Sequence, residues 1–361
     1  MLILGLETSC DETAAAIVRD GQDVLANVIS SQIAKHAAYG GVIPELAARE
    51  HLKAVQPVVE LALREAGIEA SDLDGIAVTS HPGLLPALIV GISYAKGLAA
   101  SLEKPLIGIN HFTAHIYGAF LEKSEKLRSS QSYPILSLVV SGGHTALVLI
   151  RQDGSTEVVG QTLDDAAGEA FDKAARIMNL GYPGGPLIDR LARRGDPTSH
   201  RFPRGLLGGG GTPLRDEDRL NFSFSGVKTS LLYHCRKLDP LPDDCTEASM
   251  PQPWLDTIAA FQQAIVDVLV RKTTWAVEKY DAKTVVLCGG VACNSQLRTA
   301  MTDAFSDREL LIAAPKYCTD NAAMIAGLGY HELAAGARSG WDLDATARLP
   351  ELDHVSFTSG E

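Results

Sequence analysis

Two histidines spaced four residues apart are the first sign of chemistry in this chain of 361 residues. His111 and His115 lie in the segment NHFTAH, and residues four apart share one face of an α-helix. Two imidazoles on one helix face are a common part of a metal site. An isolated pair of this spacing is better explained by a helix-capping His111 and a surface or core His115, so a metal site requires a third ligand.

The residues between the two histidines argue against a zinc protease. That class uses a His-Glu-X-X-His helix, in which the glutamate is the general base. Here Phe112, Thr113 and Ala114 fill the gap, and none of them carries a carboxylate. A metal centre at this place would therefore serve a different chemistry.

Asp320 is the candidate third ligand. It directly precedes Asn321, where an apolar helical pattern begins, so its ordinary structural role would be that of an N-cap. In a two-lobed fold, the start of this helix and the start of the His111 helix would both face the cleft. Two histidines and one aspartate suit Fe(II), Zn(II) or Mn(II), with coordination positions left open for a substrate.

Three turns rich in glycine or serine follow expected strands, at Glu7–Thr13 (ETSCDET), Val140–Thr145 (VSGGHT) and Cys288–Asn294 (CGGVACN). Glycine lets the backbone approach a ligand closely and point several N–H groups at one anion. Each turn alone is often only hairpin geometry, but three at equivalent places favour a nucleotide-type ligand. The P-loop and Rossmann glycine motifs are both missing from the sequence.

The elements that must position these residues occur in the same order twice. In residues 1–122 the patterns predict strands at 2–8, 13–18, 24–29, 75–79 and 106–109, and helices at 44–66, 86–102 and 111–122. Pro44 starts the first helix and Gly67 ends it, while Pro57 inside it predicts a kink or a break. The order is βββαβαβα.

The second half of the chain repeats the pattern. Strands are predicted at 135–141, 145–150, 284–288 and 310–313, and helices at 254–279, 294–305 and 321–335. The strand and turn at Thr13–Gly21 (TAAAIVRDG) match those at Thr145–Gly154 (TALVLIRQDG). The matched hairpins favour duplication over two unrelated domains, and therefore an α/β fold of two lobes with mixed sheets and an interlobe cleft.

The predicted domain boundaries follow from this duplication. The first lobe is expected at 1–122 and the second at 133–335, with a helical insertion at about 165–252. The last helix, 321–335, is a candidate to pack on the first lobe. A glycine-rich loop at 205–212 (GLLGGGGT) is expected to be mobile, and 336–361 to be a polar tail.

The bulk composition indicates a soluble, cytoplasmic protein. The formal net charge is −12, which is unlike that of a general nucleic-acid binder. The sequence has no run of 18 apolar residues, and the N-terminal residues lack the basic start of a signal peptide. None of the six cysteines is spaced Cys-X-X-Cys, so we interpret them as reduced thiols.

Several segments together resemble the signatures of one family, the TsaD-type tRNA threonylcarbamoyladenosine transferases, once assigned as glycoprotein endopeptidases. The resemblance covers roughly residues 2–335 in the right order, and the chain departs from the family pattern at His81, Pro86 and Ala114. Besides the first and third turns above, the matching segments are Gly41–Ala47 (GVIPELA), Asp164–Lys173 (DDAAGEAFDK), Tyr182–Pro186 (YPGGP), Asn221–Thr229 (NFSFSGVKT) and Cys318–Asn321 (CTDN).

The resemblance implies an actin, Hsp70 and sugar-kinase (ASKHA) fold. It also implies transfer of a threonylcarbamoyl group from threonylcarbamoyl-AMP to the exocyclic amine of the adenosine 3′ of the anticodon, in tRNAs that read ANN codons. By the same resemblance, His111, His115 and Asp320 match the family's iron ligands. The positions that match its adenylate site are Val139, Val140, Ser141, Gly142, Gly143, Asp172, Gly185 and Asn294, with Asp189 as a further contact.

The resemblance further implies partners. In bacteria these are an inactive paralogous subunit of the TsaB type and a small ATPase of the TsaE type, while a separate synthase makes the adenylate. No membrane is expected to take part.

The implied reaction is chemically reasonable for these residues. An adenine exocyclic amine is a poor nucleophile, because its lone pair is delocalised into the ring, so it needs an activated acyl donor held in the right orientation. A bound metal can act as a Lewis acid, and a carboxylate can take the amine proton. Asp11 and Glu12 in the first turn are the candidate catalytic residues, although capping and turn formation explain them equally well.

Three alternatives remain. A nucleotide-binding regulatory or scaffold paralogue would be expected to lose the metal ligands, which this chain keeps. A small-molecule kinase or carbamoyltransferase of the same fold would be separated by activity on small substrates. A metalloprotease is disfavoured by the missing glutamate.

A local basic patch would help an acidic chain to hold RNA. Five arginines gather in the insertion, and Lys228 follows them; a solvated helix face and a phosphate-contacting patch are equally good interpretations. The five are Arg190, Arg193, Arg194, Arg201 and Arg204.

Overall fold

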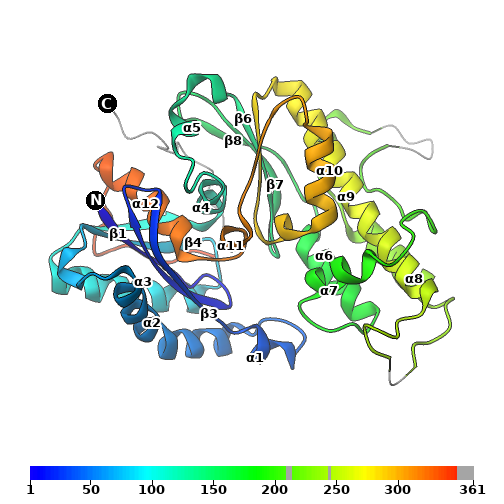
Figure 1. The fold of residues 1–361 in the computed structure, drawn as a ribbon, viewed down its shortest axis with the longest axis horizontal. Coiled ribbons are helices and arrows are strands. Elements are labelled where there is room, and N and C mark those ends of the chain that lie inside the picture. The colour runs from blue at the N-terminus through cyan, green and yellow to red at the C-terminus, as the bar shows by residue number, and fades with distance from the viewer. Residues whose placement is uncertain (209–213, 243–244, 348–361) are drawn as a thin grey trace. The chain divides into compact units, whose positions relative to one another are not determined.

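Each half of the molecule is built on one five-stranded sheet, as the computed structural model shows (Figure 1). The structure describes residues 1–208, 214–242 and 245–347. These residues divide into two compact units. Unit 1 comprises Met1–Tyr133, Ile150–Glu157 and Leu311–Glu361, the last range only as far as it is described. Unit 2 comprises Pro134–Leu149 and Val158–Leu310.

The sheet of unit 1 has the order β3-β2-β1-β4-β5. Strand β1 pairs antiparallel with β2 and parallel with β4, β2 pairs antiparallel with β3, and β4 pairs parallel with β5. The strands are β1 (Leu2–Glu7), β2 (Glu12–Arg19), β3 (Asp23–Ser31), β4 (Gly75–His81) and β5 (Leu106–Asn110).

The second sheet, with the order β10-β9-β6-β7-β8, repeats the first. If β6 is matched with β1 and the others follow in chain order, the two strand orders are identical, and β6 pairs parallel with β9 as β1 does with β4. The predicted duplication is thereby confirmed. The strands are β6 (Ile135–Val140), β7 (Thr145–Ile150), β8 (Thr156–Gln161), β9 (Thr284–Cys288) and β10 (Glu309–Ile312).

Helices cover both faces of the first sheet. The helices of unit 1 are α1 (Ile33–Ala37), α2 (Pro44–Ala66), α3 (Leu85–Leu102), α4 (His111–Gly118), α5 (Glu125–Arg128), α11 (Pro315–Cys318) and α12 (Ala322–Ala334). Leu4 and Leu6 of β1 point into a core shared with α2 and α3, whereas Gly5 between them faces α12. A Cβ atom at Gly5 would lie 2.4 Å from the Ala322 carbonyl oxygen, so glycine lets the start of α12 approach β1.

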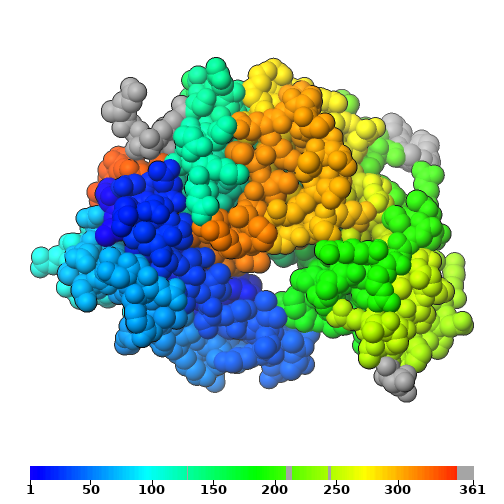
Figure 2. Space-filling model, in the orientation of Figure 1, coloured from blue at the N-terminus to red at the C-terminus, as the bar shows by residue number. Residues whose placement is uncertain are grey.

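In unit 2, helix α9 packs against α7, α10 and β6. The helices of this unit are α6 (Ala167–Ile177), α7 (Gly184–Ala192), α8 (Ser225–Cys235), α9 (Gln252–Tyr280) and α10 (Ser295–Ala304). In the space-filling view, α6 and α7 form the green surface of this unit and α8 the yellow-green surface (Figure 2).

Most predicted elements are present, with some differences. Helix α2 begins at Pro44, ends before Gly67 and runs unbroken through Pro57, so the alternative of a break was wrong. Helix α4 ends at Gly118 rather than at 122, and β8 was not predicted. Residues 209–212 of the glycine-rich loop and 348–361 of the tail lie outside the described part of the chain.

Among the described residues, α3 alone is long and apolar enough to cross a membrane. It packs against α2, β4 and β5 in unit 1, and Leu88, Ile92 and Ala95 are buried there. Helix α3 is therefore a core helix of this unit.

Candidate functional site

The two histidines lie on the first turns of α4, directly after β5. The Asn110 side chain caps this helix by accepting hydrogen bonds from the N–H groups of Phe112 (2.9 Å) and Thr113 (3.3 Å). His111 therefore does not serve as the cap and is available for another role. Both imidazoles are buried, and their ring centroids lie 4.6 Å apart.

Asp320 meets both histidines. Its Oδ1 lies 3.4 Å from Nε2 of His111 and 3.2 Å from Nε2 of His115. The expected capping role of Asp320 belongs to Asn321, whose side chain accepts from the Met324 N–H group. The group of His111, His115 and Asp320 could hold a metal ion, and all three residues belong to unit 1.

A buried carboxylate that was not predicted from the sequence contacts Nδ1 of His111, the ring nitrogen remote from Asp320. Glu7 is fully buried at the end of β1, and its Oε2 lies 2.9 Å from Nδ1 of His111. The remaining acceptor capacity of Glu7 is used by the N–H group of Ser9 (2.5 Å) and the hydroxyl of Thr79 (2.5 Å). A carboxylate on the remote nitrogen fixes the tautomer that leaves Nε2 free to bind a metal.

The electrostatics indicate that this site is built for a positive charge. Burial alone would lower the pKa of His111, but the carboxylates of Glu7 and Asp320 hold that pKa well above its usual value. Burial would likewise raise the pKa of Glu7 and of Asp320, but His111 lowers both. A cation between the buried carboxylate of Glu7 and the half-buried carboxylate of Asp320 is therefore favoured, and a metal ion would fit the nitrogen and oxygen donors.

The two histidines differ in their support. Nδ1 of His115 is buried and has no hydrogen-bond partner among the described residues, whereas Nδ1 of His111 faces Glu7. The ring orientation of His115 is thus set by packing and by Asp320 alone.

The candidate catalytic carboxylates lie in the β1–β2 turn of the same unit. Asp11 is buried, and Glu12 accepts a hydrogen bond from the hydroxyl of Ser31 (3.0 Å). Burial, followed by the charges of Asp320 and Asp11, raises the pKa of Glu12 to about 9. A cation held by Asp320 would offset this repulsion and favour the ionised form of Glu12.

In unit 2, the predicted adenylate-binding residues begin at the end of β6. Val139 and Val140 are buried in the strand, and the turn that follows is closed by a hydrogen bond from the Ser141 N–H group to the His144 carbonyl (2.8 Å). Cβ atoms added at Gly142 and Gly143 would meet nothing within 4 Å, so the backbone of this turn is accessible to a ligand.

Helices α6 and α7 place two more predicted residues close together. The carboxylate of Asp172 on α6 accepts from the N–H group of Gly184 (2.7 Å), the first residue of α7. The next residue, Gly185, also has open space where a side chain would be. Gly168 of α6 is in van der Waals contact with the Ser141 turn, since an added Cβ would lie 2.5 Å from the Ser141 carbonyl oxygen.

Asp189 and Asn294 are connected through Gln262. Asn294 caps α10 and donates to the Gln262 side chain (2.7 Å). Asp189 accepts from the N–H group and the hydroxyl of Ser295 and pairs with Arg193. Both residues thus have structural roles, in which Asp189 joins α7 to α10.

The arginine cluster of the insertion is mostly engaged within unit 2. Arg190 pairs with Glu247 (2.7 Å), Arg193 with Asp189 (2.9 Å) and Arg204 with Asp267 (2.8 Å), while Arg194 donates to backbone carbonyls. Lys228 pairs with Asp165. Arg201 is exposed, and no ion pair is found for it among the described residues.

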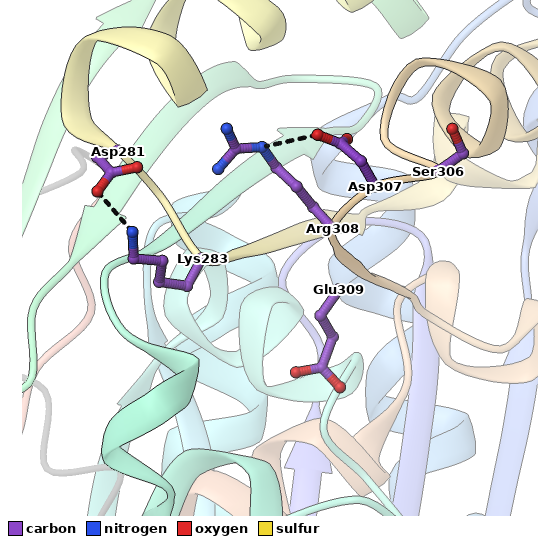
Figure 3. Close-up of a pocket in the computed structure, with 6 residues that line it drawn as sticks. All are labelled: Asp281, Lys283, Ser306, Asp307, Arg308 and Glu309. Carbon is purple, nitrogen blue, oxygen red and sulfur yellow. Dashed lines mark hydrogen bonds and ion pairs between the residues drawn. The ribbon is translucent and has the colours of Figure 1, made fainter.

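A surface cavity of about 640 Å³ lies elsewhere in unit 2, at the starts of β9 and β10 (Figure 3). Four of its five charged side chains form the pairs Asp281–Lys283 (2.5 Å) and Asp307–Arg308 (4.0 Å). The cavity lies at the start of β9, whereas the Ser141 turn follows the end of β6, which runs parallel to β9. The turn and the cavity therefore lie at opposite ends of this strand pair. We therefore assign this cavity no part in the site.

Comparison with known proteins gives a consistent result along the whole chain. The family model described as "TsaD: tRNA N6-adenosine threonylcarbamoyltransferase" matches residues 23–327. The chain is 49% identical over 358 residues to a tRNA N6-adenosine threonylcarbamoyltransferase of Geotalea uraniireducens, covering 99% of this chain and 98% of the relative. It is 46% identical to that of Thermomicrobium roseum, covering 100% of both chains.

Solved structures share the fold at low sequence identity. The chain is similar to component A of the Acidaminococcus fermentans (R)-2-hydroxyglutaryl-CoA dehydratase, with a TM-score of 0.52 at 14% identity, covering 92% of this chain and 99% of that one. It is also similar to T. kodakarensis HypF, with a TM-score of 0.57 at 14% identity, covering 91% of this chain and 47% of that one. These proteins have the ASKHA fold, which confirms the predicted fold class.

Proposed function

The chain belongs to the TsaD family of tRNA N6-adenosine threonylcarbamoyltransferases, and we propose how its two units divide that reaction. The enzyme transfers a threonylcarbamoyl group to N6 of an adenosine in tRNA. The donor we propose is threonylcarbamoyl-AMP, and the target is the adenosine 3′ of the anticodon in tRNAs that read ANN codons.

The metal centre is the first part of the proposal. We assign His111, His115 and Asp320 as the ligands of one divalent ion, Fe(II) in preference to Zn(II) or Mn(II), because two imidazoles and one carboxylate are typical of non-haem iron. The observation that carries this assignment is the convergence of the three ligand atoms within 4.8 Å of one another, backed by the buried carboxylate of Glu7. When bound, the ion supplies a Lewis acid for a carbonyl or phosphate oxygen.

The adenylate is the second part. The accessible backbone of the Ser141–Gly143 turn and the start of α7 at Gly185 offer N–H groups to a phosphate, as helix starts and glycine turns do. Asp172, Asp189 and Asn294 hold the helices that form this surface, and each also has polar atoms that suit a ribose or a threonyl group. Val139 and Val140 fix the strand from which the turn emerges.

The acceptor amine must lose a proton as the new bond forms. A carboxylate in reach of the amine is the required group, and Asp11 and Glu12 in the β1–β2 turn are the candidates. Charge proximity to Asp320 favours Glu12, since the ionisation of Glu12 responds to the charge at the metal ligands.

The remaining proposals concern assembly and place in the cell. A tRNA substrate and the family resemblance favour a cytoplasmic enzyme that works with a TsaB-type paralogue and a TsaE-type ATPase. A regulatory paralogue is disfavoured because this chain keeps all three metal ligands.

The proposal is tested in two steps. Mass spectrometry of tRNA nucleosides after depletion of the protein should show loss of threonylcarbamoyladenosine. Elemental analysis should show about one metal ion per wild-type chain and little in His115→Ala, while His36→Ala, which removes another buried histidine of unit 1, keeps the ion. Equal metal content in wild type and His115→Ala would refute the ligand assignment.

The adenylate site has its own test. Calorimetric titration with a non-hydrolysable adenylate analogue should show weaker binding by the double variant Asp172→Ala, Asn294→Ala, whose metal content should not change. Equal affinity for the two proteins would exclude these residues from the adenylate site.

A further inference from the structure

Two cations that have no carboxylate partner among the described residues lie at the C-terminal end of α8. Arg236 and Lys237 follow directly after α8 and are exposed, and no ion pair is found for either of them within the described ranges. Arg201 is also exposed and has no ion pair among the described residues. In contrast, Arg190, Arg193 and Arg204 are paired with carboxylates. In a chain with a net charge of −12, unpaired cations on one surface are a feature that a polyanion would recognise.

An exposed aromatic ring accompanies these cations. Tyr233 is 58% exposed, and the Arg236 guanidinium lies 5.5 Å from its ring centroid. An arginine over a tyrosine face keeps its N–H edge free to donate to phosphate, while the other face of the ring remains available for stacking. Exposed Tyr and Arg side chains in this arrangement are typical of surfaces that bind unpaired bases.

A histidine pair supports this end of α8. The rings of His200 and His234 lie 4.1 Å apart at an angle of 33°, and both contact the buried Phe202. Burial, followed by the charges of His200 and Lys237, lowers the pKa of His234, so its imidazole is neutral at pH 7. The pair lies beside the cations, because His234 belongs to the last turn of α8 and His200 directly precedes Arg201.

This surface lies near the proposed adenylate site within the same unit. Nε2 of His234 contacts Oγ1 of Thr257 on α9 (3.1 Å), and Gln262, five residues further along that helix, holds Asn294. Five residues of α-helix span about 7.5 Å. The end of α8 and Asn294, a residue of the proposed adenylate site, therefore contact the same helix at points about 7.5 Å apart along its axis.

We propose that this α8 surface, formed by Tyr233, Arg236, Lys237 and Arg201 with the His200–His234 pair, is a tRNA contact of the enzyme. The proposal rests on the transferase function stated above. Tyr233 stacks on an unpaired base of a tRNA loop, and the three cations contact the phosphates on either side. Phosphate contacts position the RNA without reading its sequence, so all tRNA substrates should depend on the surface alike.

The test measures tRNA affinity across a salt series, with the full chain reconstituted with its partner subunits. The double variant Arg236→Gln, Lys237→Gln should weaken binding and reduce the slope of log K against log salt by roughly 0.7 to 0.9 per lost contact. Tyr233→Ala should weaken binding by roughly 5- to 150-fold without changing the slope, and Tyr233→Trp should restore affinity. Arg215→Gln, which removes an exposed but paired arginine of the same unit, is the matched control and should bind as wild type does.

Each outcome has a definite meaning. Metal content and binding of the adenylate analogue should be unchanged in every variant, which shows that the fold is intact. If the folded variants bind tRNA with the wild-type affinity and slope while wild type modifies tRNA, the α8 surface is refuted and the transferase function stands. If wild type neither binds nor modifies tRNA, the proposed function itself fails.

Discussion

Glu7→Gln should weaken metal binding without removing a ligand. The carboxylate of Glu7 accepts three hydrogen bonds, from the Ser9 N–H group, the Thr79 hydroxyl and Nδ1–H of His111. A glutamine of the same shape can accept on one side only. If its amide NH₂ faces His111, the imidazole proton must move to Nε2, the nitrogen that would bind the metal. If its amide oxygen faces His111, the NH₂ group opposes the N–H group of Ser9.

Both arrangements weaken the support of one ligand. Loss of such a supporting partner typically reduces metal affinity by about 10- to 100-fold, which corresponds to roughly 1.4 to 2.7 kcal/mol. The assay is competitive titration of the metal-free protein with Fe(II) under anaerobic conditions, and with Zn(II) as a redox-inert probe. Glu60→Gln makes the same chemical change on the exposed face of α2 and should leave the affinity unchanged.

The stability of the metal-free protein separates this explanation from simple unfolding. Glu7→Gln should remain folded when it is metal-free, and the fall in its metal affinity should persist at temperatures far below its Tm. A metal affinity equal to that of wild type would show that Glu7 does not orient His111 for metal binding.

Three further predictions concern unit 2. Gly168→Ala should displace the Ser141 turn, costing about 1 to 3 kcal/mol of stability and weakening the adenylate analogue in calorimetry, whereas Gly97→Ala, with open space around it, should do neither. Burial lowers the pKa of Lys272 to about 8, so the unfolded state binds more protons than the folded state between pH 8 and 10.5. The free energy of unfolding should therefore rise with pH in this range, by at most roughly 1.4 kcal/mol per pH unit relative to the variant Lys272→Met. Denaturant titrations of the two proteins at several pH values measure this difference. Burial alone would raise the pKa of Asp164, but hydrogen bonds from the start of α8 lower it. The stabilisation by Asp164 is therefore present above about pH 4 and lost as the pH falls through the pKa of the folded state. In Asp164→Asn the free energy of unfolding should fall less steeply with decreasing pH than in wild type.

The strands and turns were largely predictable because their patterns are local. Burial on both faces makes β1, β6 and β9 continuous apolar runs, and Pro44 and Gly67 mark the two ends of α2 by backbone geometry. Strand β8 was missed because it is only partly buried and its alternation is weak. Helix α4 ends at Gly118, and a glycine is an ordinary stop signal for a helix, so the sequence did hold a sign of this earlier end.

The site was predictable only where residue type and spacing carry the information. His111 and His115 are four apart on a helix, and Asp320 directly precedes the N-cap of another helix. The role of Glu7 depends on a partner 104 residues away, although a glutamate ending an apolar strand was a usable signal. The pairing of Arg190, Arg193 and Arg204 also depends on distant carboxylates, so the sequence showed a basic cluster where the structure has ion pairs.

Unit 1 is built from separate segments of the chain, so its parts are synthesised at different times. The second sheet is complete once β10 has been synthesised, but unit 1 then still lacks α12, which packs against β1, β2, β4 and α4. Asp320 arrives with that last segment, more than two hundred residues after His111. A nascent chain therefore cannot bring the three proposed metal ligands together until Asp320 has been synthesised, and a product truncated before Asp320 lacks one of them. If the proposed ligands hold a metal, its loading reports that translation has passed Asp320.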